Sequence, residues 1–211
     1  MTDLEDDMSQ ASLLGPAARQ SIAALVLVRY FGFDQDPKFS PWFEQHQEAL
    51  SQVLVGGSRF YRQTSTGTAV STEEIRPLKN LVERALGACD PDGPPFETEI
   101  VDHLVLATEV LDYLSEPEDL ERLERVFEHA EELAEAGEEM ATNESLAEKG
   151  KAVEFLQLES EIRRSDLNEM SHAQEVTSFD PSPLLLRSET FSRRYAEVIA
   201  SGYSDEEAGR H

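Results

Sequence analysis

Glutamate and histidine side chains at helical spacing are the residues of this sequence that could bind a metal ion. Glu99 and His103 are four positions apart and share one face of a helix, and His129 lies in a later acidic segment. Helical bundles hold pairs of iron ions between glutamates and Glu-x-x-His motifs. The sequence has such a motif only at Glu169 to His172, where a linker is expected. A metal-dependent enzyme built on Glu99, His103 and His129 is therefore an alternative hypothesis, and the main prediction includes no metal and no cofactor.

Sequence signatures of nucleophilic and phosphate chemistry are missing. No Gly-x-Ser-x-Gly elbow, phosphate-binding loop or Gly-x-Gly-x-x-Gly turn occurs. Cys89 is the only cysteine, and its acidic neighbours Asp90 and Asp92 should raise the pKa of its thiol rather than activate it. We therefore assign no catalytic residue, and the sequence favours a protein that is not an enzyme.

The segment from Glu118 to Glu139 is the most charged part of the chain, with ten acidic residues and two arginines. Rows of carboxylates on a helix could bind a basic protein, as an immunity-like or decoy protein does. The alternative is that the charge only keeps the surface hydrated, as in a protein adapted to high salt. The candidate partner-binding residues are Glu118, Glu121, Glu124, Glu128, Glu131, Glu132 and Glu135.

The C-terminal helix carries a group of cations beside an apolar stripe. Arg187, Arg193 and Arg194 lie near Phe191 and Tyr195. This pattern predicts that the helix docks its arginines against the acidic helices, that it is simply another helix of the bundle, or that it reaches a second subunit. A homo-oligomer formed through the C-terminal arm is therefore a further hypothesis.

Composition limits the other partners. The 211 residues carry a net charge of −25. Such a charge repels nucleic acid and anionic membranes, so neither is expected as a direct partner. The N-terminus, "MTDLEDDMSQ", lacks the basic start of a signal peptide, and no apolar run is long enough to span a membrane. These features predict a cytoplasmic protein.

Helical periodicity dominates the chain, and we expect an all-α, single-domain bundle of six or seven helices. The first expected helix, 16–31, is apolar nearly all round and should be the buried centre of the bundle. The other expected helices span about 40–57, 71–87, 96–114, 115–137, 146–167 and 184–202. The bundle domain is assigned to 1–167, and 168–211 to a linker or arm followed by the C-terminal helix and an acidic tail.

Local signals define the expected helix ends. Ser71 with Glu74, and Ser115 with Glu118, have the spacing of capping boxes. Pro77 predicts a kink, or a helix that begins near Arg76. Glycines predict the ends of four helices, at Gly56-Gly57, Gly87, Gly137 and Gly202, and 58–71 is expected to be a polar loop.

The order of these pieces resembles the YjaG-like family, small helical bacterial proteins with a domain of unknown function. The likeness rests on "RYFG" at the end of the first helix, on "EEIRPLKNLVERAL", and on "EIVDHLVLATEVLDYL" followed by the acidic helix. It extends over about residues 12–167, and Asp102 and His129 fall at comparable places. The resemblance implies a helical fold and no settled biochemical role.

Overall fold

The computed structural model of the protein describes residues 3–33, 46–90, 95–141, 154–174 and 179–208. Within these ranges it contains eight helices and no strand, so the all-α prediction is confirmed, although six or seven helices were expected. The helices are α1 (Asp3–Ser12), α2 (Pro16–Tyr30), α3 (Gln47–Thr64), α4 (Thr72–Leu86), α5 (Pro95–Ser115), α6 (Leu120–Ala141), α8 (Phe155–Ala173) and α9 (Ser182–Ala208).

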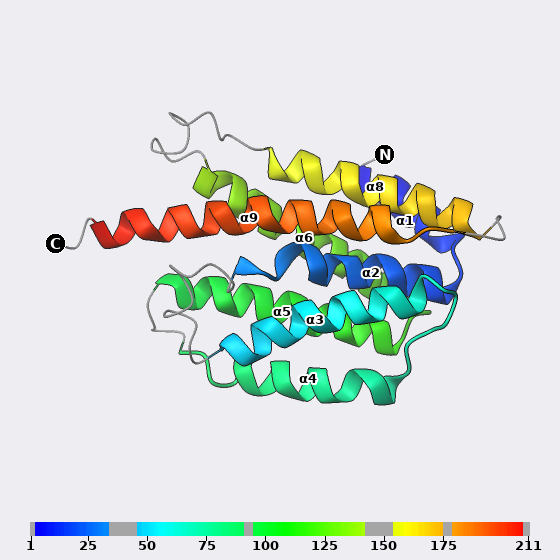
Figure 1. Ribbon diagram of the computed structural model, residues 1–211, viewed down its shortest axis with the longest axis horizontal. Coiled ribbons are helices and arrows are strands. Elements are labelled where there is room, and N and C mark those ends of the chain that lie inside the picture. Colours follow the sequence, from blue (N-terminus) through cyan, green and yellow to red (C-terminus); the bar gives the residue numbers. More distant parts are fainter. Residues whose placement is uncertain (1–2, 34–45, 91–94, 142–153, 175–178, 209–211) are drawn as a thin grey trace.

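Helix α2 is the centre of the bundle. Every residue from Ala18 to Tyr30 is buried, because the helix is surrounded by α3, α5, α6, α8 and α9. Figure 1 shows α2 between α3 on one side and α9 on the other. The prediction of a buried central helix is therefore confirmed.

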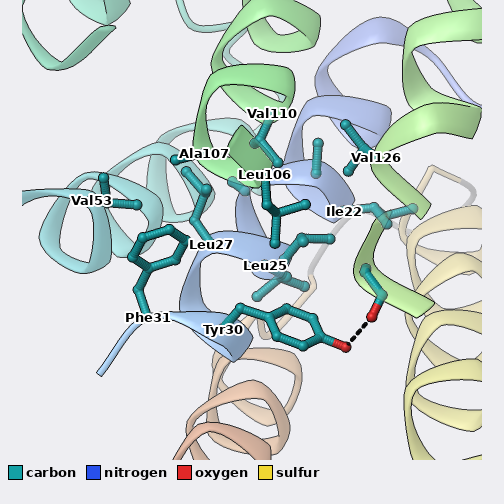
Figure 2. Close-up of a cluster of buried hydrophobic side chains, with 14 of the residues drawn as sticks. Ile22, Leu25, Leu27, Tyr30, Phe31, Val53, Leu106, Ala107, Val110 and Val126 are labelled. Atoms are coloured by element: carbon teal, nitrogen blue, oxygen red, sulfur yellow. Dashed lines mark hydrogen bonds between the residues drawn. The ribbon is translucent and has the colours of Figure 1, made fainter. Parts of the chain in front are cut away.

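The core forms where α2 meets its neighbours. Figure 2 shows Ile22, Leu25 and Leu27 of α2 among side chains of the surrounding helices, such as Val110 and Val126. Burying an aliphatic side chain of this size contributes about 1.5–3 kcal/mol. The Tyr30 hydroxyl donates a hydrogen bond of 2.7 Å to the carbonyl oxygen of Ala130, which satisfies the polar atom that this aromatic residue brings into the core.

Four glycines that were expected to end helices, Gly56, Gly57, Gly137 and Gly202, lie inside them instead. Helix α3 continues through Gly56 and Gly57 to Thr64, so the expected loop at 58–71 is helical in its first half. A Cβ on Gly57 would lie 2.7 Å from Leu27 Cβ of α2, and one on Gly137 would lie 2.7 Å from the Tyr195 ring of α9. These glycines allow helices to approach closely, and tertiary packing outweighs their weak helix propensity.

The predicted helix starts at Pro16 and Ser71 and the predicted end at Gly87 are correct, and several other predicted ends are wrong. Ser71 caps α4 in a full capping box with Glu74, and Gly87 follows its last turn; Pro77 lies inside this helix rather than at its start. Helix α6 begins at Leu120, because Asp119 rather than Ser115 accepts a hydrogen bond of 3.2 Å from the Arg122 N–H.

The C-terminal part of the chain is more helical than expected. Helix α8 extends to Ala173, beyond the change of character expected at 168, and α9 continues past Gly202 to Ala208. Helix α1, which the sequence analysis did not identify, packs against α6 and α8. Two of the expected helices begin outside the described residues. One was expected to begin near Ser40-Pro41, with Trp42 and Phe43 in its first turn, and the other at Leu146.

Candidate binding surfaces

Helix α6 presents a row of carboxylates to solvent. Glu121, Glu128, Glu132 and Glu135 are exposed, and Glu124 is half-buried. Their side chains form no ion pair with the part of the chain that the structure describes. They alternate with the buried stripe of Leu123, Phe127, Ala130 and Ala134, which packs into the core. Five of the seven candidate glutamates therefore remain available as surface charges.

The other two candidate glutamates are paired within the protein. Glu118 forms an ion pair of 2.7 Å with Arg19 of α2, although most of its side chain is exposed. Glu131 forms an ion pair with the buried guanidinium of Arg163 on α8, which also lies 2.8 Å from Asp7 of α1. These two carboxylates hold helices together, so they are less suited to contact a partner.

The residues singled out on α9 have different roles in the structure. Arg187 forms ion pairs with Asp166 at 2.7 Å and with Glu169 at 2.9 Å, both on α8. The rings of Phe191 and Tyr195 are buried and contact the Tyr30 ring, with centroid distances of 5.3 and 5.2 Å. These contacts attach α9 to the bundle.

The remaining two cations of α9 lie on its surface. Arg193 and Arg194 are exposed, and the Arg193 guanidinium donates to the Glu189 carbonyl and the Thr190 hydroxyl of its own helix. No ion pair joins either cation to the acidic helices among the described residues.

The residues of the metal hypothesis lie on two neighbouring helices. His103 of α5 is fully buried, and its Nδ1–H donates a hydrogen bond of 2.7 Å to the Glu99 carbonyl. Burial lowers the pKa of His103 to about 4, so its ring is neutral. His129 of α6 contacts the Glu109 carboxylate at 3.0 Å. Among the described residues these side chains do not form a compact set of ligand atoms.

An open groove lies above α2, between α3 and α9. It has a volume of about 790 Å³. Its floor includes Val28 and Gly32, at the end of α2. The Ser192 hydroxyl of α9 donates to the carbonyl oxygen of Phe31 at 3.2 Å and so attaches α9 beside this floor. Figure 1 shows α3 and α9 on opposite sides of α2. Residues of all three helices line the groove.

Apolar side chains line the groove on both sides. Val55 of α3 and Leu186 of α9 are 59% and 58% exposed, which makes them the most exposed large apolar residues on the described helices. The rim carries Arg62 on α3 and Glu189, Arg193 and Glu197 on α9. An apolar channel with a charged rim is the form in which proteins bind amphipathic segments of other proteins.

The sequence analysis missed this groove for a physical reason. Leu186 belongs to the run "PLLL", in which Leu184 is fully buried, and the sequence analysis did not assign these leucines to separate faces of the helix. Val55 adjoins the glycine pair that was expected to end its helix. A sign of the surface was available, because both residues fall outside the apolar stripes of their helices.

The fold and these surfaces define an acidic, all-α helical bundle with an open apolar groove. No family model, curated protein or solved structure matches the chain. The resemblance to the YjaG-like family therefore stays a prediction. No helix in the described part of the chain is long and apolar enough to cross a membrane.

Proposed function

We propose that this is a binding protein that holds a basic, amphipathic segment of a partner protein in the groove between α3 and α9. The observation that carries the proposal is the exposure of Val55 and Leu186 on the two walls of that groove. Covering each of these side chains is worth up to about 1.5–3 kcal/mol. Association and ordering of the bound segment offset part of this gain.

The charge of the protein supports a basic partner. The net charge of −25 attracts a basic segment over long range and repels an acidic one. A second copy of this chain carries the same charge, which disfavours it as the occupant. The exposed carboxylates of α6 add to this field, but surface charges contribute more to association rate and specificity than to affinity. In this proposal the groove provides the affinity and α6 helps to attract the partner.

The rim adds a preference for the spacing of the partner's charges. Glu189, Arg193 and Glu197 are four residues apart along α9, so they form a row with alternating charge beside the groove. Arg62 lies on the opposite wall. A bound helix that places lysine or arginine beside Glu189 and Glu197 avoids contact between like charges, so segments with cations at this spacing should fit better than segments without them.

The proposal is tested with a display library of short peptides that tile the proteome of the source organism. We expect the selected peptides to be basic, with apolar residues at positions i, i+3, i+4 and i+7. Binding should be lost in Val55→Asp and Leu186→Asp, because a carboxylate on the wall disrupts the apolar contact. Leu13→Asp is the matched control, since Leu13 is 81% exposed and lies outside the groove.

Three results would overturn the proposal. One is a library without enriched peptides at the native ionic strength, which would favour hydration or salt adaptation as the role of the acidity. Another is enrichment that persists unchanged in Val55→Asp and Leu186→Asp, which would move the binding surface elsewhere. The third is a dimer in sedimentation that both groove variants disrupt, because a second copy would then occupy the groove and the proposed partner would be wrong.

A further inference from the structure

Three helix ends meet at one end of the bundle and bring together three metal-ligating side chains. His46 immediately precedes α3, Cys89 follows the last turn of α4, and Glu97 lies in the first turn of α5. Figure 1 shows the beginning of α3, the end of α4 and the beginning of α5 at the same end of the molecule. A ring nitrogen of His46, the sulfur of Cys89 and a carboxylate oxygen of Glu97 all lie within 4.8 Å of one another.

The separations are close to those in a metal centre. In a tetrahedral zinc site with bonds of about 2.0–2.3 Å, the ligand atoms are roughly 3.3–3.8 Å apart. His46 Nε2 is already 3.2 Å from Glu97 Oε1. The same Glu97 oxygen accepts a hydrogen bond of 3.1 Å from the backbone N–H of Asp90, which orients the carboxylate. Small rotations of the three side chains are enough to bring their ligand atoms within bonding distance of one ion.

The His46 side chain presents one ring nitrogen to the other two ligands. The side chain is only 2% exposed, so its position is set by the packing around it. Its Nε2 lies 3.2 Å from Glu97 Oε1, so Nε2 is the nitrogen that would bind the ion. The ring proton would then lie on Nδ1, which is buried and has no hydrogen-bond partner among the described residues.

We propose that His46, Cys89 and Glu97 form a zinc site with a fourth position open to water. One nitrogen, one sulfur and one oxygen ligand suit Zn²⁺, which binds all three donor types. Mg²⁺ and Ca²⁺ require oxygen ligands, and Cu⁺ prefers sulfur alone. On binding, the Cys89 thiol releases its proton to solvent and the thiolate forms the zinc–sulfur bond. The bound ion links the ends of α3, α4 and α5, and none of its three ligands lines the proposed groove.

Cobalt absorption of the metal-free, full-length protein provides the test. Cys89 is the only cysteine, so a thiolate-to-cobalt charge-transfer band identifies it as a ligand without ambiguity. We expect this band to saturate at one Co²⁺ per chain and to disappear when Zn²⁺ is added. The band should be absent in Cys89→Ser. His46→Asn and Glu97→Gln should weaken Zn²⁺ binding by at least about tenfold, the loss caused by removing even an outer partner of a ligand.

Glu83→Gln is the control, because Glu83 is an exposed glutamate of α4 outside the cluster, and it should bind Zn²⁺ like the wild type. Circular dichroism establishes that each variant is folded. Ser is close in size to Cys, and Cys89 is only half-buried, so Cys89→Ser tests the site even if the His46 variant does not fold. The proposal is overturned if no charge-transfer band forms, or if Cys89→Ser binds Zn²⁺ as tightly as the wild type.

Discussion

The Arg29 guanidinium of α2 lies 3.0 Å from the Asp166 carboxylate of α8, and both side chains are fully buried. Arg29 also contacts Glu159 at 2.9 Å, and Asp166 contacts Arg187 of α9 at 2.7 Å. Four charged groups from three helices therefore form one network beside the central helix. Desolvation makes such a network expensive to build, and removal of one member leaves its partners charged and buried.

Replacing Arg29 by methionine should lower the free energy of unfolding by about 3–5 kcal/mol, because Glu159 then loses its cation in the core. Urea denaturation at neutral pH measures the change. Glu116→Gln is the control, since Glu116 pairs with Arg122 on the surface at 3.5 Å and should change stability by less than about 1 kcal/mol. Equal, small effects of both substitutions would show that the network contributes nothing specific.

Asp166 should make stability fall as pH rises from about 4 to about 6. Burial raises the pKa of this carboxyl from 3.8 to about 6, against the opposing effects of Arg29 and Arg187. Glu159 also raises the pKa. In that window the folded state binds the proton that the unfolded state has already lost, so stability declines with pH by roughly 3 kcal/mol before it levels off.

Asp166→Asn removes this contribution, and its stability is therefore expected to fall more steeply than that of the wild type when the solution is acidified from pH 6 to 4. Urea midpoints at fixed ionic strength give the two profiles. Parallel profiles would mean that Asp166 has its ordinary pKa in the folded protein.

His103 has the opposite effect on the pH dependence of stability, over nearly the same pH range as Asp166. Burial lowers the pKa of its imidazole to about 4, while the Glu99 carbonyl opposes the shift and His129 adds to it. As pH falls, the His103 imidazole becomes protonated near pH 6.5 in the unfolded chain, whereas in the folded protein it stays neutral until about pH 4. The stability present above pH 6.5 should therefore be lost by roughly 3 kcal/mol as pH falls to about 4.

His103→Gln should reduce the loss of stability on acidification from pH 6.5 to about 4. Asp166→Asn is expected to increase that loss. The same urea series measures it, and NMR titration of the ring protons gives the pKa directly. An imidazole that titrates near pH 6.5 in the folded wild type would contradict the prediction.

The buried charges mark the limit of what could be predicted from the sequence. The central position of α2 followed from its apolar residues on all sides, and the start of α4 from the capping box at Ser71. Arg29 and Asp166 could not be paired in this way, because they are far apart in the chain and charged residues are normally assigned to the surface. Asp7 belongs to α1, which the sequence analysis did not identify, because a segment rich in acidic residues is normally assigned to the surface. In the structure Asp7 is paired with the buried guanidinium of Arg163.

The candidate sites were harder to predict than the fold. Glu118 and Glu131 were assigned to a partner, and only the packed structure reveals their ion pairs with Arg19 and Arg163. His46, Cys89 and Glu97 come from three separate helix ends, and no short motif connects them. Arg187 was correctly noted as a cation beside an apolar stripe, but its partner Asp166 lies on a helix whose end was placed too early.

The two glycines of α3 offer a direct test of why the helix does not stop there. Gly57→Ala should lower the free energy of unfolding by about 1–3 kcal/mol, because its Cβ would lie 2.7 Å from Leu27 Cβ and 3.1 Å from the Ala24 carbonyl oxygen of α2. Gly56→Ala is the matched comparison. Its Cβ would meet only the end of the Leu78 side chain and the Phe60 ring, and the Leu78 side chain can rotate away.

Gly56→Ala should therefore be close to neutral, since alanine gains about 1 kcal/mol in helix propensity and the repositioned Leu78 offsets part of it. Thermal and urea unfolding of the two variants, measured side by side, separate the effects. If both substitutions stabilise the protein, α2 and α3 have room between them and close approach does not explain the glycine pair. If Gly57→Ala alone destabilises it, Gly57 is required by the packing of α3 against α2.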